Sequence, residues 1–236
     1  MGNKVIWITG ASTGIGRELA KVLAKTGNII VVTARRKSRL TSLVNEIKFA
    51  GNHASAFVCN VTSERSVQIT TKRIREKHGK IDCLINNAGV TVFKSLQETK
   101  VYDYDYVLNT NLRGAFLCIK AVLPEMIKRK NGHIINVLSV AALKPFTNSA
   151  VYSASKAGLF ALANCLREEV RKFNIKVTNI LPGATETPMW DSKTRQKYHR
   201  RMMSPRELAI TIASIIETPK KVHLEEVIVR PIKGDL

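Results

Sequence analysis

The stretch TGASTGIG, residues 9–16, follows the apolar run KVIWIT and leads into a segment of helical period, residues 15–26. Gly10 permits a tight turn, Gly14 allows the backbone to approach a ligand, and Gly16 allows the helix to pack closely. The spacing G-x-x-x-G-x-G departs from the more familiar G-x-G-x-x-G. The N–H groups at the start of a helix bind anions. The sequence therefore predicts a phosphate-binding turn between the first strand and the first helix.

The rest of the chain continues this alternation of strands and helices. Apolar or β-branched runs predict strands at residues 4–9, 28–34, 53–59, 81–86, 133–139, 176–182 and 225–231. Helical spacing predicts further helices at residues 38–50, 63–79, 104–129, 151–172 and 205–217. This order is typical of an α/β fold, a doubly wound parallel sheet of seven strands with helices on both faces. No repeat, low-complexity segment or linker divides residues 1–236, so we expect one domain.

Composition narrows the classes of protein to consider. With 44% hydrophobic and 24% charged residues in 236, the chain has the composition of a globular protein. It has no apolar run of the roughly 18 residues that a membrane helix needs and no signal peptide, so we expect a cytoplasmic protein without a membrane partner. The net charge of +20 raises the alternative of a nucleotide-binding regulator or nucleic-acid-associated protein. No nucleic-acid-binding module is recognisable, and no specific nucleic-acid partner is expected.

The four cysteines predict neither disulfides nor a metal site. Cys59, Cys83, Cys118 and Cys165 lie far apart in apolar contexts, without a C-x-x-C pair or a histidine at ligand spacing. We expect buried free thiols.

Two arginines follow the second predicted strand. A protein that binds NAD carries an acid near this position, which contacts the ribose 2′-hydroxyl; an arginine suits the 2′-phosphate of NADP. Arg35 and Arg36 therefore favour NADP(H), with NAD(H) as the other possible cofactor. The alternative is that both merely belong to the general basic excess.

Two further motifs carry polar groups suited to chemistry. NNAG, residues 86–89, ends the fourth predicted strand, where it forms either a turn beside a ligand or an ordinary helix cap. YSASK, residues 152–156, places Tyr152 and Lys156 four positions apart, on one face of a helix. An adjacent ammonium lowers the pKa of a phenol and so prepares it for proton exchange. These five residues alone favour an ordinary surface pair.

Together these motifs resemble the short-chain dehydrogenase/reductase family, a Rossmann-type fold, over nearly the whole chain. Ser139 precedes Tyr152 by 13 residues, as the family pattern requires, and Asn111 in NLRG matches its fourth catalytic position. The resemblance implies hydride transfer between NADP(H) and a carbonyl compound or secondary alcohol, with Tyr152 as acid and base. It further implies that Lys156 also holds the nicotinamide ribose, Ser139 the substrate oxygen, and Asn111 a water molecule.

The resemblance also implies a cofactor site, a substrate lid and a homodimer or homotetramer. The implied cofactor-binding residues are Gly10, Ser12, Thr13, Gly14, Ile15, Gly16, Arg35, Arg36, Asn60, Val61, Asn87, Ala88, Gly89, Tyr152, Lys156, Pro182, Gly183, Thr185 and Thr187. The lid, residues 184–205, offers five side chains either for an apolar substrate pocket or for simple helix packing: Met189, Trp190, Tyr198, Met202 and Met203. A 3-oxoacyl-carrier-protein reductase remains an alternative, although VIVRPIKGDL lacks the Asp-Gly-Gly ending typical of that branch.

Overall fold

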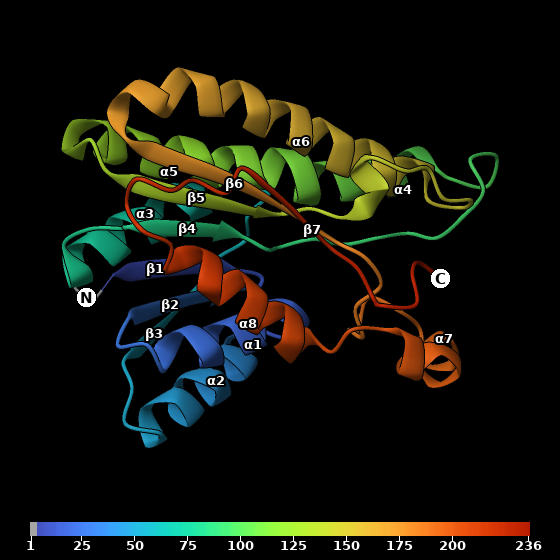
Figure 1. Cartoon of the computed structure of the whole chain (residues 1–236), viewed down its shortest axis with the longest axis horizontal. Coiled ribbons are helices and arrows are strands. Elements are labelled where there is room, and N and C mark those ends of the chain that lie inside the picture. The colour runs from blue at the N-terminus through green and yellow to red at the C-terminus, as the bar shows by residue number, and fades with distance from the viewer. Residues whose placement is uncertain (1–3) are drawn as a thin grey trace.

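The computed structural model describes residues 4–236 and contains one parallel sheet (Figure 1). Its strands are β1 (Val5–Thr9), β2 (Ile29–Ala34), β3 (Ala54–Val58), β4 (Cys83–Asn86), β5 (Gly132–Val137), β6 (Ile175–Pro182) and β7 (Glu226–Val229). Within residues 4–236 the sheet has seven strands in the order β3-β2-β1-β4-β5-β6-β7. The predicted fold class is therefore confirmed. The chain order reverses between β1 and β4, where the carboxyl ends of the strands leave room for a ligand.

Helices cover both faces of the sheet (Figure 1). One face packs against α1 (Gly14–Ala24), α2 (Lys37–Phe49) and α8 (Pro205–Ile216). The other face packs against α3 (Glu64–His78), α5 (Gly114–Arg129) and α6 (Ala150–Val170). Because both faces are covered, the strands are apolar on both sides, which explains why they read as continuous hydrophobic runs.

The helical region predicted at residues 104–129 consists of three elements. Helix α4 (Val101–Leu108) leads into a π-helical turn (Asn109–Arg113), and α5 follows. Of the five residues in the turn, only Asn111 is buried. A π-helical turn carries no distinct hydrophobic period, so sequence spacing does not separate it from the helices on either side.

Helix α7 (Ser192–Tyr198) was not predicted. None of its residues is buried, so it lacks the apolar stripe by which an amphipathic helix is recognised. Its N-terminus is fixed by Asp191, whose side chain accepts a hydrogen bond from the Thr194 backbone N–H at 2.9 Å. This is an ordinary helix cap.

Buried asparagines link the central strands. Asn86 donates to Asn136 at 3.0 Å, Asn136 to Asn179 at 3.2 Å, and Asn179 to Asn164 of α6 at 3.0 Å. The first three occupy matching positions on β4, β5 and β6. A slip of one residue would turn an asparagine to the opposite face, so this chain of amides holds the register of the strands that carry the site.

The cysteine prediction is partly wrong. All four are free thiols, but Cys165 is exposed while Cys59, Cys83 and Cys118 are buried. Cys165 lies on the outward face of α6, and its apolar neighbours in the sequence point the other way.

In the described residues, no helix has the length and apolar character to cross a membrane. No group of three or more potential metal ligands occurs in residues 4–236 either.

Candidate active site

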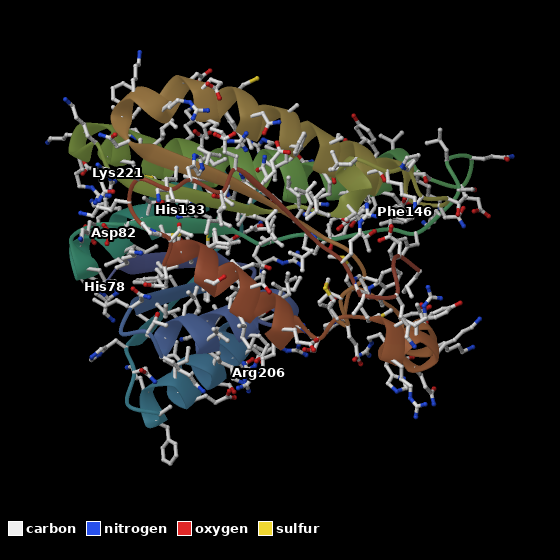
Figure 2. The ribbon with its side chains drawn as sticks, viewed as in Figure 1. His78, Asp82, His133, Phe146, Arg206 and Lys221 are labelled. Atoms are coloured by element: carbon white, nitrogen blue, oxygen red, sulfur yellow. The ribbon has the colours of Figure 1, made fainter. Side chains whose placement is uncertain are left out.

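A cleft of about 910 Å³ runs along the carboxyl ends of the strands. Phe146, which lines it, lies at the opposite end of the molecule from Asp82 and His133, which mark the amino ends of β4 and β5 (Figure 2). All predicted cofactor-binding residues except Gly16 line the cleft, as do three of the four predicted catalytic residues. Asn111 is the one predicted catalytic residue that does not line the cleft. This volume is within the range of about 300–1,000 Å³ typical of cofactor and ligand sites.

The glycine turn is held against NNAG. The Asn87 side chain donates to the backbone oxygens of Thr9 at 2.9 Å and Gly10 at 3.2 Å. Gly10 has a φ of +66°, and a Cβ there would lie 2.6 Å from the Ala88 Cα. A Cβ on Gly16 would lie 2.3 Å from the Asn87 amide nitrogen. The structural role predicted for Gly16 thus explains why it lies behind the cleft and not in its wall.

The start of α1 faces the cleft without a side-chain cap. Thr13 is the N-cap residue, but its side chain accepts no capping hydrogen bond, and the first turn contains no acid. Backbone N–H groups at this end of α1 are therefore available to an anion, and the positive end of the helix dipole favours one.

Arginines line the end of the cleft beyond β2. Arg35 and Arg36 lie there as predicted, and Arg36 donates to the Ser12 hydroxyl at 3.3 Å. Arg39, on the first turns of α2, joins them and was not predicted. Its position close behind Arg35 and Arg36, on the helix that follows them, was the available signal. Three guanidinium groups at one end make it a site for a doubly charged anion such as a phosphate.

Tyr152, Lys156 and Ser139 meet near the middle of the cleft. Tyr152 and Lys156 share one face of α6, with the lysine Nζ 5.7 Å from the centre of the phenol ring. The buried Lys156 Nζ donates to the Val137 backbone oxygen at 2.9 Å. Ser139 lies two residues beyond the end of β5, so the strand predicted to reach it is shorter than expected. Its hydroxyl accepts a hydrogen bond from the Ala141 N–H at 3.1 Å.

Asn111 is buried behind this group, and its side chain makes three hydrogen bonds. Its amide nitrogen donates to the Val90 oxygen at 2.9 Å and to the Ser155 hydroxyl at 3.0 Å. Its amide oxygen accepts from the Val90 N–H at 2.8 Å. Both N–H donors of the side chain are used, so a water held by Asn111 would need another of its atoms. Ser155, inside the YSASK motif, is the buried link between Asn111 and α6.

Burial decides the protonation of the central pair. It raises the pKa of Tyr152 to about 12, against an opposing hydrogen bond with Ser139. This direction is opposite to the lowering predicted from the neighbouring lysine. Burial also lowers the pKa of Lys156 to about 8. It therefore disfavours the charged form of the lysine, the form that was expected to lower the pKa of the phenol.

The buried lysine leads to a stability prediction. A base whose pKa falls on folding binds fewer protons when folded, so its burial costs stability below about pH 8 and less as the pH rises toward the ordinary pKa of 10.5. Lys156→Met should therefore stabilise the fold at pH 7 by about 1–3 kcal/mol, after allowing for the lost hydrogen bond to Val137. Urea unfolding of the variant and of the native protein, at pH 7 and at pH 10, measures this difference in the free energy of unfolding.

The stabilisation of Lys156→Met over the native protein should be smaller at pH 10 than at pH 7. Lys120→Met, which changes an exposed lysine on α5, provides the control. A Lys156→Met variant that is less stable than the native protein at pH 7 would show that the burial of Lys156 does not lower the stability of the fold.

Aromatic side chains form the remaining wall. Phe93 and Trp190 stack with their ring centres 5.2 Å apart, and Phe146 and Met189 line the same cleft. Phe93 and Phe146 were not predicted, because neither belongs to a motif. Of the five lid residues proposed for the pocket, Tyr198, Met202 and Met203 do not line it. Met202 is buried elsewhere, and the backbone of Met203 bonds to Ala184 at 3.0 Å, which fastens the lid.

A parallel sheet, a glycine turn on a helix N-terminus and a tyrosine-lysine pair in one cleft define a dinucleotide-dependent dehydrogenase. The sequence profile of the short chain dehydrogenase family matches residues 4–198, and the chain belongs to that family. It is 34% identical to the sepiapterin reductase of Chlorobaculum tepidum, over 98% of each chain.

Solved structures of relatives have the same fold. A metagenomic short-chain oxidoreductase in complex with NADP is 32% identical, with a TM-score of 0.85 over 97% of this chain and 96% of the other. A variant of the actinorhodin polyketide ketoreductase with NADPH is 30% identical, with a TM-score of 0.90 over 97% of this chain and 96% of the other.

Proposed function

We propose that this protein is an NADP(H)-dependent oxidoreductase that interconverts a small carbonyl compound and its secondary alcohol. The observation that supports it best is the meeting of Tyr152, Lys156 and Ser139 in a cleft that has three arginines at its far end. Proton-transfer groups and a phosphate-binding end in one cleft suit a reaction between a nucleotide cofactor and a carbonyl group.

The cleft fits NADP(H) in volume, in hydrogen-bond donors and in charge. Arg35, Arg36 and Arg39 are the residues for the 2′-phosphate, and the uncapped start of α1 is the place for the pyrophosphate. Lys156 makes one hydrogen bond within residues 4–236, although an ammonium has three donors, so donors remain for ribose hydroxyls. Relatives solved with NADP and NADPH support the same choice. NAD(H) is the weaker alternative.

When bound, NADPH supplies the hydride for the carbonyl carbon. The Tyr152 hydroxyl donates the proton to the carbonyl oxygen, and the Ser139 hydroxyl donates a second hydrogen bond that holds this oxygen in place. A phenol with its pKa raised stays protonated at neutral pH, as a proton donor must. Lys156 supplies positive charge beside the phenolate left behind. Lys156→Met should accordingly bind NADPH more weakly as well as turn over slowly.

A panel of carbonyl substrates followed through NADPH absorbance tests this function. It should include a pterin with a side-chain ketone, a 3-oxoacyl thioester, simple aryl ketones and long-chain aldehydes. We expect reduction of at least one class with NADPH, and oxidation of the matching alcohol with NADP⁺. If no class is turned over although NADPH binds, the enzymatic role is wrong and the binding role gains support.

The alternatives are less well supported. A regulator that only binds nucleotides has no need of Ser139, Tyr152 and Lys156 together, and the relatives reported above carry the names of reductases or oxidoreductases. A 3-oxoacyl-carrier-protein reductase is the finer alternative among enzymes. An acidic carrier protein would suit the basic lid, in which Lys197, Arg200 and Arg201 are exposed.

We also propose a homodimer or homotetramer. Large apolar side chains are exposed on α4 and α5, among them Tyr102 at 74% and Phe116 at 43%, and Ile232 beyond β7 is fully exposed. A second copy of the chain would bury such surfaces. Light scattering after size-exclusion chromatography should give a mass of two or four chains, and Phe116→Glu should lower it. A native mass of one chain would contradict the proposal.

A further inference from the structure

Large apolar side chains are exposed around the mouth of the cleft. Phe93, Met189 and Leu236 line the cleft, and all three are nevertheless exposed. Leu96 is 70% exposed and Leu143 is 49% exposed on two segments that adjoin the cleft, residues 90–100 and 143–149. Exposed apolar side chains that gather at one place on a protein mark a contact with a partner or with a membrane.

Contacts between distant segments bring these side chains to one end of the molecule. The Lys94 N–H donates to the Asn148 oxygen at 2.9 Å, which joins residues 90–100 to the loop before α6. In that loop, Lys144 Nζ lies 3.5 Å from Asp235 Oδ2, close to the end of the chain. Figure 1 shows α7 and the C-terminus at this same end of the molecule. We call residues 90–100, 143–149, 184–206 and 230–236 the mouth surface.

The mouth surface is also strongly basic. Its four segments contain eleven lysines and arginines but four acids. Lys193, Lys197 and Arg200 are exposed, and none of them has a carboxylate oxygen within 4.0 Å among residues 4–236, unlike Lys144. Lys193 and Lys197 lie one turn apart on α7, where like charges repel and lower the stability of the helix. The fold of the lid does not explain these cations, and they are suited to an anion outside the chain.

Exposed apolar groups beside unpaired cations suit the surface of an anionic bilayer. The apolar groups enter the interface, and the cations attract the phosphate groups of the lipids. A substrate inside the cleft does not explain the whole rim, because Leu96 and Leu143 do not line the cleft. An acidic protein would pair with the cations but has no need of the exposed leucines.

We propose that the mouth surface binds the protein to an anionic membrane, with the cleft open toward the lipid. A protein that lies on a bilayer needs no spanning helix, so the proposal replaces the expectation of no membrane partner, which considered spanning segments. The docking itself is independent of the reaction. Its consequence for the substrate rests on the proposed function: the carbonyl compound is lipid-soluble and enters the cleft from the bilayer.

Sedimentation with sucrose-loaded vesicles tests the docking without any substrate. The native protein should sediment with vesicles of equal parts phosphatidylglycerol and phosphatidylcholine, and not with vesicles of phosphatidylcholine alone. Added salt should weaken the binding, because it screens the attraction between exposed charges and phosphates. A native protein that stays in the supernatant with anionic vesicles at low salt would overturn the proposal.

Matched pairs of lysines separate the mouth surface from the general attraction of a basic protein. Lys193→Gln with Lys197→Gln should weaken vesicle binding by about tenfold or more, since each cation near an anionic surface contributes roughly fivefold. Lys220→Gln with Lys221→Gln removes the same charge, and Lys221 lies at the opposite end of the molecule from Phe146 (Figure 2). This control pair should bind almost as the native protein does. An equal loss in both pairs would show that net charge alone attracts the protein, contrary to the proposal.

The apolar rim is tested in the same way. Leu96→Ser with Leu143→Ser should weaken binding at low and at high salt, because apolar contacts are not screened. Phe49→Ser, at the end of α2, changes a side chain that is 97% exposed and should leave binding unchanged. If binding depends on the lysines but not on the leucines, the surface fits an acidic protein, and the bilayer is the wrong partner.

Tryptophan fluorescence tests the orientation on the membrane. The chain has two tryptophans, and Trp7 is fully buried in the sheet. Brominated lipid in the anionic vesicles should therefore quench Trp190, which lies beside the exposed Met189. Binding without quenching would mean that another face contacts the membrane.

A reaction measurement keeps the docking separate from the proposed function. 2-Tridecanone stays in the bilayer, and 2-butanone stays in water. Anionic vesicles, compared with neutral ones, should raise the rate of reduction of 2-tridecanone by about tenfold and leave that of 2-butanone unchanged, since they concentrate the protein at the lipid. Vesicle binding without reduction of any ketone would support the docking and contradict the reaction. Reduction of both ketones without vesicle binding would support the reaction and overturn the docking.

Discussion

Tyr152→Phe should lower kcat/KM for every carbonyl substrate by about 10²–10⁴-fold, the usual contribution of a general acid. The substitution removes one hydroxyl from the wall of the cleft and leaves the ring in place on α6. We propose this hydroxyl as the proton donor, and burial raises its pKa to about 12, so it keeps its proton at neutral pH. Ser139 can still bind the carbonyl oxygen, but the oxygen would have to take its proton from solvent.

Binding and stability should change little in the same variant. NADPH binding, followed by the change in its fluorescence, and the urea midpoint should both stay close to those of the native protein. Tyr198→Phe changes an equivalent hydroxyl outside the cleft and serves as the control. Turnover by Tyr152→Phe within a few-fold of the native rate would show that another group is the acid.

NADPH should be preferred over NADH by about tenfold to a hundredfold in kcat/KM, because a charge-assisted hydrogen bond to the 2′-phosphate is worth roughly 1.5–3 kcal/mol. Ala34, at the end of β2, and Arg35 both line the cleft. Ala34→Asp with Arg35→Leu should reverse the preference, since the new carboxylate accepts hydrogen bonds from the ribose hydroxyls of NADH and repels a phosphate. The structure adds Arg39 to this end of the cleft, so Arg39→Leu in the same background should strengthen the reversal.

Initial rates with both cofactors, at saturating substrate, measure the preference. Arg65→Leu, an exposed arginine on α3 away from this cleft, controls for the change in net charge. Equal use of both cofactors by the native protein, or an unchanged preference in the double variant, would mean that these arginines do not contact the 2′-phosphate.

Much of the site was predictable because its motifs are local in the chain. The Tyr152 and Lys156 pair depends on one helical turn, and the glycine turn depends on the residues that join β1 to α1. Parallel strands bring their carboxyl ends to one edge, so the segments after β1, β2 and β4 meet without any knowledge of side-chain packing. Cys165 shows the limit, since apolar content alone does not determine which face of a helix is covered.

The sequence by itself determined the order of the seven strands and of the helices that cover the sheet, the class of fold and the position of each motif, because hydrophobic period and glycine spacing act between near neighbours. Only the tertiary structure decided the protonation of the central pair, since burial depends on what packs around Tyr152 and Lys156. It also decided the wall opposite them, where Trp190 stacks on Phe93 and Asp235 meets Lys144. These partners come from distant parts of the chain, and no local spacing encodes a contact that exists only after the sheet has formed.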